Sequence, residues 1–187
     1  AISSSDESKV KADWPNVDVV ADPKRLFNDP NIDLIVIPTP NDTHFPLAKA
    51  ALEAGKHVVV DKPFTVTLSQ ARELDALARS LGRLLSVFHN RRWDSDFLTV
   101  KALLSEGTLG EIGYFESHFD RFRPQVRNRW REQAGPGSGI WYDLAPHLLD
   151  QAVNLFGLPV SMTVDLAQLR PGAQTTDYFH AVLSYPQ

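Results

Sequence analysis

The stretch from His57 to Pro63 constrains the fold of this chain more than any other. Its sequence is His-Val-Val-Val-Asp-Lys-Pro, a short β-branched strand that ends on an acid, a lysine and a proline. Because Pro63 has no backbone N–H, it cannot continue a central ladder, so the strand should end just after Lys62. Ligands of open α/β sheets bind outside the carboxyl ends of the strands. Lys62 is therefore expected at the rim of a binding site, unless it is only a surface lysine after an edge strand.

Two further segments predict strands of the same sheet. Residues 34–37 form an apolar run between turn residues, which is typical of a strand buried on both faces, and residues 84–88 form the third strand. Leucines and alanines at helical spacing lie between the strands, which predicts βαβ units with right-handed crossovers. The three loops that follow the strands should therefore lie at one edge of the sheet. Their polar residues are Thr39, Asn41, His44, Asp61, Lys62, Asn90, Arg91 and Arg92.

The pattern changes after about residue 110. Residues 111–122 are aromatic and partly alternating, which suits an open sheet with one solvated face. A helix over residues 143–156 and strands over 160–169 and 178–185 are expected to follow. The predicted class is α/β, with an incomplete Rossmann-type parallel sheet in residues 1–110. An α+β domain with an open, largely antiparallel sheet is expected to begin in residues 111–187.

The predicted helix of the second domain carries a group of polar residues. Asp143, His147 and Asp150 are spaced by four and three, so they project from one side of a helix. Pro146 is tolerated only in a first turn, which places the helix start near Asp143 and makes this residue a candidate N-cap. The plainer alternative is a capping aspartate and a packed histidine. Three glycines in residues 135–139 would let backbone approach a ligand closely, although they also suit a flexible loop.

Charge and composition exclude several classes of function. The net charge is −4 and no basic tract stands out, so nucleic acid is not expected as a partner. The absence of cysteine excludes disulfides, thiolate zinc sites and cysteine nucleophiles. No apolar run approaches the roughly 20 residues that span a bilayer, so no membrane is expected and a cytoplasmic enzyme is the default. One local cluster of positive charge could hold a small anion, and it comprises Arg121, Arg123, Arg127, Arg129 and Arg131.

Four motifs in order resemble the Gfo/Idh/MocA family of oxidoreductases, which includes glucose–fructose oxidoreductase and inositol dehydrogenase. Asp61-Lys62-Pro63 is similar to the family's Glu-Lys-Pro motif at the end of a strand. Residues 137–150 are similar to its Gly-rich loop followed by Asp-x-Gly-x-His-x-x-Asp. Residues 38–44 match its Pro-Thr-Pro-Asn-x-x-His loop, and residues 90–92 match an Asn-x-Arg segment. The resemblance covers nearly the whole chain and is nearest to the bacterial NADP-dependent scyllo-inositol dehydrogenase-like members.

The chain also departs from the family pattern. Asp61 replaces the usual glutamate, and Ala145-Pro146 replaces the usual glycine and apolar residue. The family's first strand, its Gly-x-Gly-x-x-Gly turn and most of its second sheet are missing, so the chain is expected to be truncated at both ends. The resemblance therefore describes a parent protein. The fragment alone is expected to bind the cofactor poorly and to be inactive, because the helix N-terminus that holds the pyrophosphate is missing.

The resemblance implies hydride transfer between NAD(P) and a hydroxyl-bearing carbon of a cyclitol or sugar. An imidazole suits the proton step, so His147 is the expected general base in oxidation and acid in reduction. Lys62 would hydrogen-bond the same oxygen and favour its alkoxide form, or carry the proton itself. Asp143 would accept a hydrogen bond from a neighbouring hydroxyl. Arg121 and Arg123 are candidate substrate contacts, although they are more simply solvated loop residues.

The resemblance also implies the cofactor site and the assembly. Small hydroxyl residues, Ser3 and Ser4, stand where an acid would select NAD, so NADP is the expected cofactor ahead of NAD, with Lys9 as a possible phosphate partner. No metal is expected. A homo-oligomer through the second-domain sheet is expected by analogy. The other predicted cofactor residues are Thr39, Pro40, Asn41, His44, Asp61, Lys62, Asn90 and Arg91.

Two other functions remain open from sequence. A non-catalytic relative could sense a dinucleotide or sugar, although the presence of both Lys62 and His147 argues against it. A metal-dependent sugar hydrolase or isomerase could use His118, Asp143 and His147. Stoichiometric metal and inhibition by a chelator would favour this last reading over hydride transfer.

Overall fold

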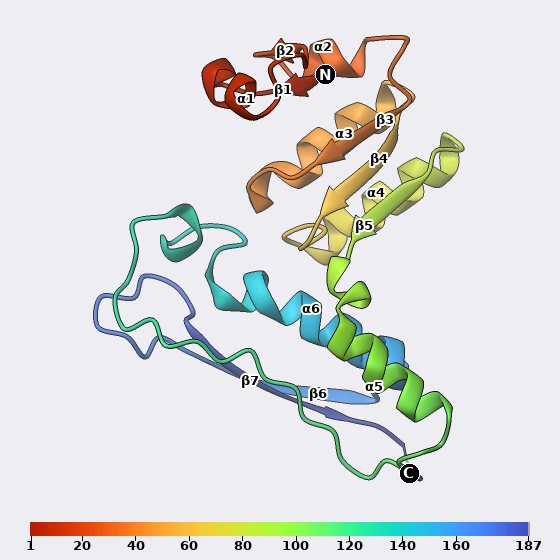
Figure 1. Cartoon of the computed structure of the whole chain (residues 1–187), viewed down its shortest axis with the longest axis vertical. Coiled ribbons are helices and arrows are strands. Elements are labelled where there is room, and N and C mark those ends of the chain that lie inside the picture. Colours follow the sequence, from red (N-terminus) through yellow and green to blue (C-terminus); the bar gives the residue numbers. More distant parts are fainter. Residues whose placement is uncertain (187) are drawn as a thin grey trace. The chain divides into compact units, whose positions relative to one another are not determined.

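The chain folds into two compact units. The computed structural model describes residues 1–186 and divides the chain between Phe88 and His89 (Figure 1). This division differs from the boundary expected near residue 110, because η2 (Asn90–Trp93) and α5 (Ser95–Ser105) belong to the second unit. Hydrogen bonds tie η2 to the long helix of that unit: Gln151 Nε2 donates to the Arg91 carbonyl at 3.0 Å.

The first unit contains the predicted parallel sheet. Its strand order is β3 (Leu34–Ile37), β4 (His57–Asp61) and β5 (Leu85–Phe88), all parallel. The connections are η1 (Asn41–Thr43) with α3 (His44–Glu53), and α4 (Leu68–Ser80). The prediction of βαβ units is confirmed, and β4 ends directly before the Lys62–Pro63 turn.

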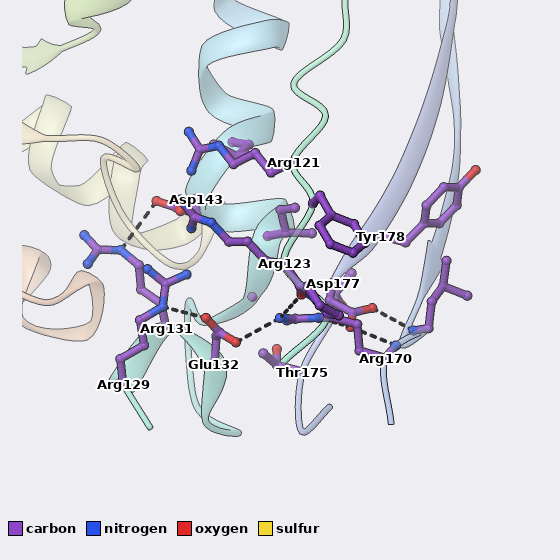
Figure 2. Close-up of a pocket in the computed structure, with 17 residues that line it drawn as sticks. Arg121, Arg123, Arg129, Arg131, Glu132, Asp143, Arg170, Thr175, Asp177 and Tyr178 are labelled. Atoms are coloured by element: carbon purple, nitrogen blue, oxygen red, sulfur yellow. Dashed lines mark hydrogen bonds and ion pairs between the residues drawn. The ribbon is translucent and has the colours of Figure 1, made fainter. Parts of the chain in front are cut away.

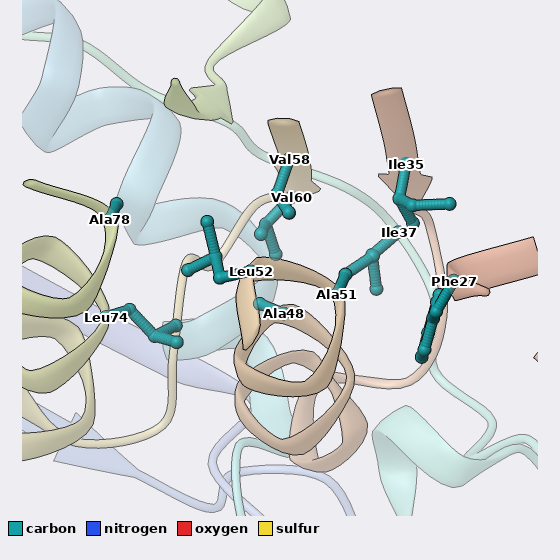
Figure 3. Packing of buried hydrophobic residues seen from close by; sticks show 10 residues of the cluster. All are labelled: Phe27, Ile35, Ile37, Ala48, Ala51, Leu52, Val58, Val60, Leu74 and Ala78. Carbon is teal, nitrogen blue, oxygen red and sulfur yellow. The ribbon is translucent and has the colours of Figure 1, made fainter. Parts of the chain in front are cut away.

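One face of this sheet carries the hydrophobic core. Ile35 and Ile37 of β3 and Val58 and Val60 of β4 are buried against α3 and α4, as Figure 3 shows. The residues between them face the other way, and Val36 is 60% exposed. The expectation that residues 34–37 are buried on both faces is therefore wrong for this structure. Successive right-handed crossovers in one direction put both helices on the same face of the sheet, so the described residues cover only that face.

The first 28 residues add a second, smaller sheet and two short helices to the first unit, and Phe27 reaches its hydrophobic core. β1 (Ile2–Ser3) pairs in parallel with β2 (Val19–Val20), and the helices are α1 (Glu7–Asp13) and α2 (Lys24–Phe27). Sequence reasoning did not identify α1 and β2. The Asp6 carboxylate caps α1 by accepting from Lys9 N at 3.0 Å. Asp22 Oδ1 accepts from Lys24 N at 2.9 Å just before α2, whose N-cap position is occupied by Pro23.

The second unit is a helix packed on a two-stranded antiparallel sheet. α6 (Gly139–Phe156) follows η3 (Trp130–Glu132), and β6 (Ser161–Ala167) pairs with β7 (Tyr178–Ser184) (Figure 1). Trp141 of α6 packs edge-on against Phe179 of β7, with ring centroids 5.4 Å apart. Across residues 1–186, the structure has no helix with the length and hydrophobicity to cross a membrane.

Two expectations about this unit are corrected. Residues 111–122 form no strand, because no neighbouring segment among residues 1–186 pairs with their backbone. The helix begins at Gly139 and not near Asp143, so Pro146 lies inside it and Asp143 is not its N-cap. Its start is fixed from outside, since Ile140 N donates to the Thr176 carbonyl at 2.7 Å. Gly139 has φ +90°, and a Cβ there would lie 2.7 Å from Thr175 Oγ1, so only glycine fits this close approach.

The core of the first unit predicts the effect of a leucine truncation. Leu52 is fully buried between α3 and the sheet, whereas Leu68 at the start of α4 is 65% exposed. We expect Leu52→Ala to lower the free energy of unfolding by about 2–5 kcal/mol, through lost burial and the cavity left behind. The matched control Leu68→Ala should change it by about 0.5 kcal/mol or less. Urea denaturation measures both, and equal losses would contradict this assignment of the core.

Candidate active site

The rim of the first unit is held together by His44. This first residue of α3 is fully buried at the carboxyl edge of the sheet. Its Nδ1 lies 2.8 Å from the carbonyl oxygen of Pro63, in the loop after β4. Its Nε2 lies 2.8 Å from the carbonyl oxygen of Thr39, in the loop after β3. One side chain therefore fixes two of the loops that sequence analysis placed at one edge.

The chemistry of His44 is determined by these two acceptors. Carbonyl oxygens only accept, so a neutral ring donates to one of them and an imidazolium donates to both. In either form the ring nitrogens are directed at backbone. His44 contributes to the rim by positioning loops, and its direct contact with a cofactor stays a prediction.

The other candidates of the first unit lie in two places. Thr39 Oγ1 is 2.6 Å from Thr43 Oγ1, and Asn41 is buried next to them in the chain. Asp61 Oδ1 accepts from the backbone N–H of Lys62 at 2.8 Å, which fixes the start of the turn that carries the lysine. Ser3 and Ser4 stand apart, at the end of β1 in the smaller sheet.

The donor set of this rim fits one part of a dinucleotide. The hydroxyl of Thr39, the amide of Asn41 and the ammonium of Lys62 can hydrogen-bond ribose hydroxyls and a carboxamide. The sequence contains no Gly-x-Gly-x-x-Gly turn, which holds the pyrophosphate in Rossmann folds. The residues present therefore fit the nicotinamide-ribose half, and their assignment to it remains a prediction.

α6 presents the polar residues of the second unit on successive turns. Asp143, His147 and Asp150 share one side of this helix, as their spacing predicts. His147 is buried, and Asp143 Oδ1 lies 3.4 Å from Arg131 Nε. Asp150 accepts two hydrogen bonds from Arg92, at 2.8 and 2.6 Å, so it clamps η2 onto the helix.

Arg91, a predicted cofactor residue, has partners within the second unit. Its Nη1 donates to Asp94 Oδ2 at 2.7 Å, and its guanidinium lies 4.9 Å from the ring centroid of Phe119. These contacts fix the conformation of η2. The predicted cofactor contacts of Asn90 and Arg91 remain predictions.

A cavity of about 360 Å³ opens beside the first turns of α6. Its wall consists of residues 121–124, residues in and around η3, the start of α6, and residues 169–170 and 175–178, as Figure 2 shows. Asp143 lines this cavity, whereas His147 lies one turn further along the helix. The charged lining residues are Arg121, Arg123, Arg129, Arg131, Arg170, Glu132, Asp143 and Asp177.

The buried carboxylate of Glu132 organises this wall. Its Oε1 accepts from Arg129 Nε at 2.7 Å, and its Oε2 accepts from the backbone N–H of Arg127 at 3.0 Å. The guanidinium of Arg170 lies 3.2 Å from the same Oε2 (Figure 2). One carboxylate therefore joins the arginine-rich loop to the segment before β7.

Arg170 extends this network in two directions. Its Nε donates to Asp177 Oδ2 at 2.8 Å, and Asp177 also accepts from the backbone N–H groups of Leu169 and Arg170. Its Nη1 donates to the carbonyls of Arg123 and Gln125, at 3.2 and 3.3 Å. The Arg170 side chain thus connects the loop that carries Arg123 to the segment between β6 and β7.

The surroundings shift the pKa values of both acids downward. Burial raises the pKa of Glu132, but the Arg127 N–H and the charges of Arg129 and Arg170 outweigh it, so the pKa lies below its usual range. Burial likewise opposes the hydrogen bonds from Leu169 and Arg170 at Asp177, and its pKa is also lowered. Both groups are carboxylates at neutral pH and stabilise this unit in that form.

Sequence reasoning missed Glu132, Arg170 and Asp177. The spacing of Arg129 and Glu132 was the only local signal, since residues three apart pair within a helical turn. Arg170 and Asp177 lie about forty residues further along, and no pattern in the sequence connects them to the loop. His118, Asp143 and His147 do not form a metal site, since no cluster of metal-ligating side chains occurs in residues 1–186.

Comparison with known protein families identifies both units. Residues 1–89 match the model of an oxidoreductase family with an NAD-binding Rossmann fold, Gfo/Idh/MocA. Residues 97–187 match the Gfo/Idh/MocA C-terminal domain. The chain belongs to the Gfo/Idh/MocA family of oxidoreductases.

Relatives of this Gfo/Idh/MocA chain are similar along nearly all of its length. It is 89% identical over 186 residues to the uncharacterized oxidoreductase YdgJ of Escherichia coli. This match covers 100% of the chain and 54% of YdgJ. It is 44% identical over 184 residues to the scyllo-inositol 2-dehydrogenase (NADP+) IolW of Bacillus subtilis, covering 98% of the chain and 51% of IolW. The solved structure of a putative oxidoreductase from Yersinia pestis superposes with a TM-score of 0.92 at 74% identity, covering 98% of the chain and 52% of that protein. The chain spans about half the length of the curated relatives it matches.

The position of His44 predicts a loss of stability on its removal. His44→Leu leaves one or two buried carbonyls without a donor, which should lower the free energy of unfolding by about 1–3 kcal/mol for each. His180→Leu, on the exposed edge of β7, is a control that should change it little. Urea unfolding measures both variants. An unchanged stability for His44→Leu would contradict the bridging role.

The lowered pKa of Glu132 predicts a pH-dependent contribution to stability. A carboxylate whose pKa is depressed in the folded state stabilises fully above its unfolded pKa of about 4.3, and this stabilisation is lost as pH falls through the folded value. Glu132→Gln should therefore lower the free energy of unfolding by about 2 kcal/mol at pH 7, with a smaller difference at low pH. Asp165→Asn, an exposed acid on β6, is the control. A difference that grows on acidification would contradict the network.

Proposed function

We propose that the full-length protein carrying this chain is an NAD(P)-dependent dehydrogenase of cyclitols or sugars, with a preference for NADP. The observation that carries the proposal is the placement of His147 on α6, one turn after Asp143, which lines a cavity. The similarity to the NADP-dependent scyllo-inositol 2-dehydrogenase supports the substrate class and the cofactor.

The residues of this chain would divide the oxygen chemistry between them. In oxidation, His147 takes the hydroxyl proton, and in reduction it returns the proton to the carbonyl oxygen. Lys62 donates a hydrogen bond to the same oxygen and stabilises its alkoxide character. Asp143 accepts from a neighbouring hydroxyl and so orients the ring. A nicotinamide cofactor held by this chain would supply the hydride acceptor in oxidation and the hydride donor in reduction.

Other residues would hold the cofactor, and several of them lie at the rim of the first unit. Thr39, Pro40 and Asn41 would contact ribose and nicotinamide, with His44 fixing their loop. Ser3 and Ser4 would accommodate the 2′-phosphate of NADP. Asp61, Asn90 and Arg91 complete the proposed set. We also propose a cytoplasmic homo-oligomer that associates through the sheet of the second unit.

Two substitutions in the full-length protein test this function. A panel of cyclitols and aldoses with NADP or NAD, followed by reduced-nicotinamide absorbance, should identify a substrate. Lys62→Met and His147→Asn should then lower kcat by about 100-fold or more, because each removes a group that acts on the reacting oxygen. Lys101→Met and His180→Gln, at exposed positions of α5 and β7, are matched controls that should retain activity.

The controls separate chemistry from folding. Circular dichroism should show the same fold in all four variants. Wild-type activity in Lys62→Met and His147→Asn would contradict the proposed roles. Cofactor binding without turnover of any polyol or sugar would contradict the proposed reaction.

A further inference from the structure

The cavity of the second unit holds more arginine than its acids neutralise. Arg129 pairs with Glu132 at 2.7 Å, Arg131 with Asp143 at 3.4 Å, and Arg170 with Asp177 at 2.8 Å. Arg121 and Arg123 line the same cavity, and neither forms an ion pair with any residue in the described part of the chain. Each acid in the lining is already paired, so a net positive charge remains in the cavity.

The backbone at Arg123 is anchored. Arg170 Nη1 donates to the carbonyl of Arg123 at 3.2 Å and to that of Gln125 at 3.3 Å. Figure 2 shows the guanidinium groups of Arg121 and Arg123 extending over the cavity that Asp143 also lines. A held backbone reduces the entropy lost when the Arg123 side chain binds a ligand.

Arg123 also lies among other positive charges. Partial desolvation and the charges of Arg121, Arg127 and Arg129 lower the pKa of Arg123. A guanidinium stays protonated under such conditions, so the crowding raises the energy of the empty site. An anion between the two arginines would relieve it.

We infer that this cavity binds the anionic group of an acidic polyol or sugar, a carboxylate or a phosphate, through Arg121 and Arg123. The inference rests on the proposed function and narrows its substrate class. The planar fork of arginine matches the two oxygens of either anion. The cavity volume of about 360 Å³ suits a monosaccharide-sized ligand.

Matched ligands and matched variants test this inference in the full-length protein. The ligands are glucose, glucuronate and glucose 6-phosphate, compared by calorimetric binding at constant ionic strength and by turnover with NADP. We expect tighter binding of at least one acidic ligand. Arg121→Gln and Arg123→Gln should each weaken that binding by about tenfold or more while changing glucose binding little. Arg127→Gln is the control, since Arg127 belongs to the same loop but does not line the cavity.

The outcomes distinguish this inference from the proposed function. Selective binding of an acidic ligand that Arg121→Gln and Arg123→Gln abolish supports the inference, even where no turnover is seen. Equal binding of glucose and both acids, or equal losses in all three arginine variants, overturns it. Turnover of neutral polyols alone, with no selective binding of acids, overturns the inference and leaves the dehydrogenase intact. The relative responses to glucuronate and glucose 6-phosphate separate carboxylate from phosphate.

Discussion

The buried carboxylate of Glu132 is the interaction on which the second unit depends. A carboxylate of this kind is tolerated inside a protein only when charge and hydrogen bonds compensate its desolvation, and here two arginines and one backbone N–H do so. The compensation joins segments that are distant in sequence. The carboxylate also neutralises part of the positive charge of the loop. The charge that remains makes the cavity net positive.

In the first unit, the groups that need a partner are backbone oxygens, and a histidine side chain provides it. The loops after β3 and β4 expose carbonyl oxygens, and the ring of His44 lies against one from each loop. The loops of the rim around Lys62 are therefore held through their backbone carbonyls by the side chain of His44. Preorganisation of this kind lets a catalytic group act without reordering its surroundings.

The sequence predicted the parallel sheet because three apolar strands are each followed by polar turn residues. The segments between them have the regular leucine spacing of helices. Asp61-Lys62-Pro63 located the end of β4, and the helical spacing of Asp143 and His147 located the polar side of α6. Prediction from sequence failed where contacts with a distant segment determine the local structure. Residues 111–122 alternate like a strand but find no ladder partner among residues 1–186. Pro146 suggested a late helix start, whereas the Ile140–Thr176 hydrogen bond sets an earlier one. Glu132, Arg170 and Asp177 were beyond prediction, since only folding brings them together.

Transfer of a labelled hydride tests the proposed chemistry most directly. The full-length protein is incubated with oxidised NADP and a substrate polyol that carries deuterium on the carbon bearing the reacting hydroxyl, and the reduced cofactor is examined by NMR. Hydride transfer predicts that deuterium appears at C4 of the nicotinamide, on one face of the ring. Oxidised substrate without deuterium at that carbon of the cofactor would contradict it.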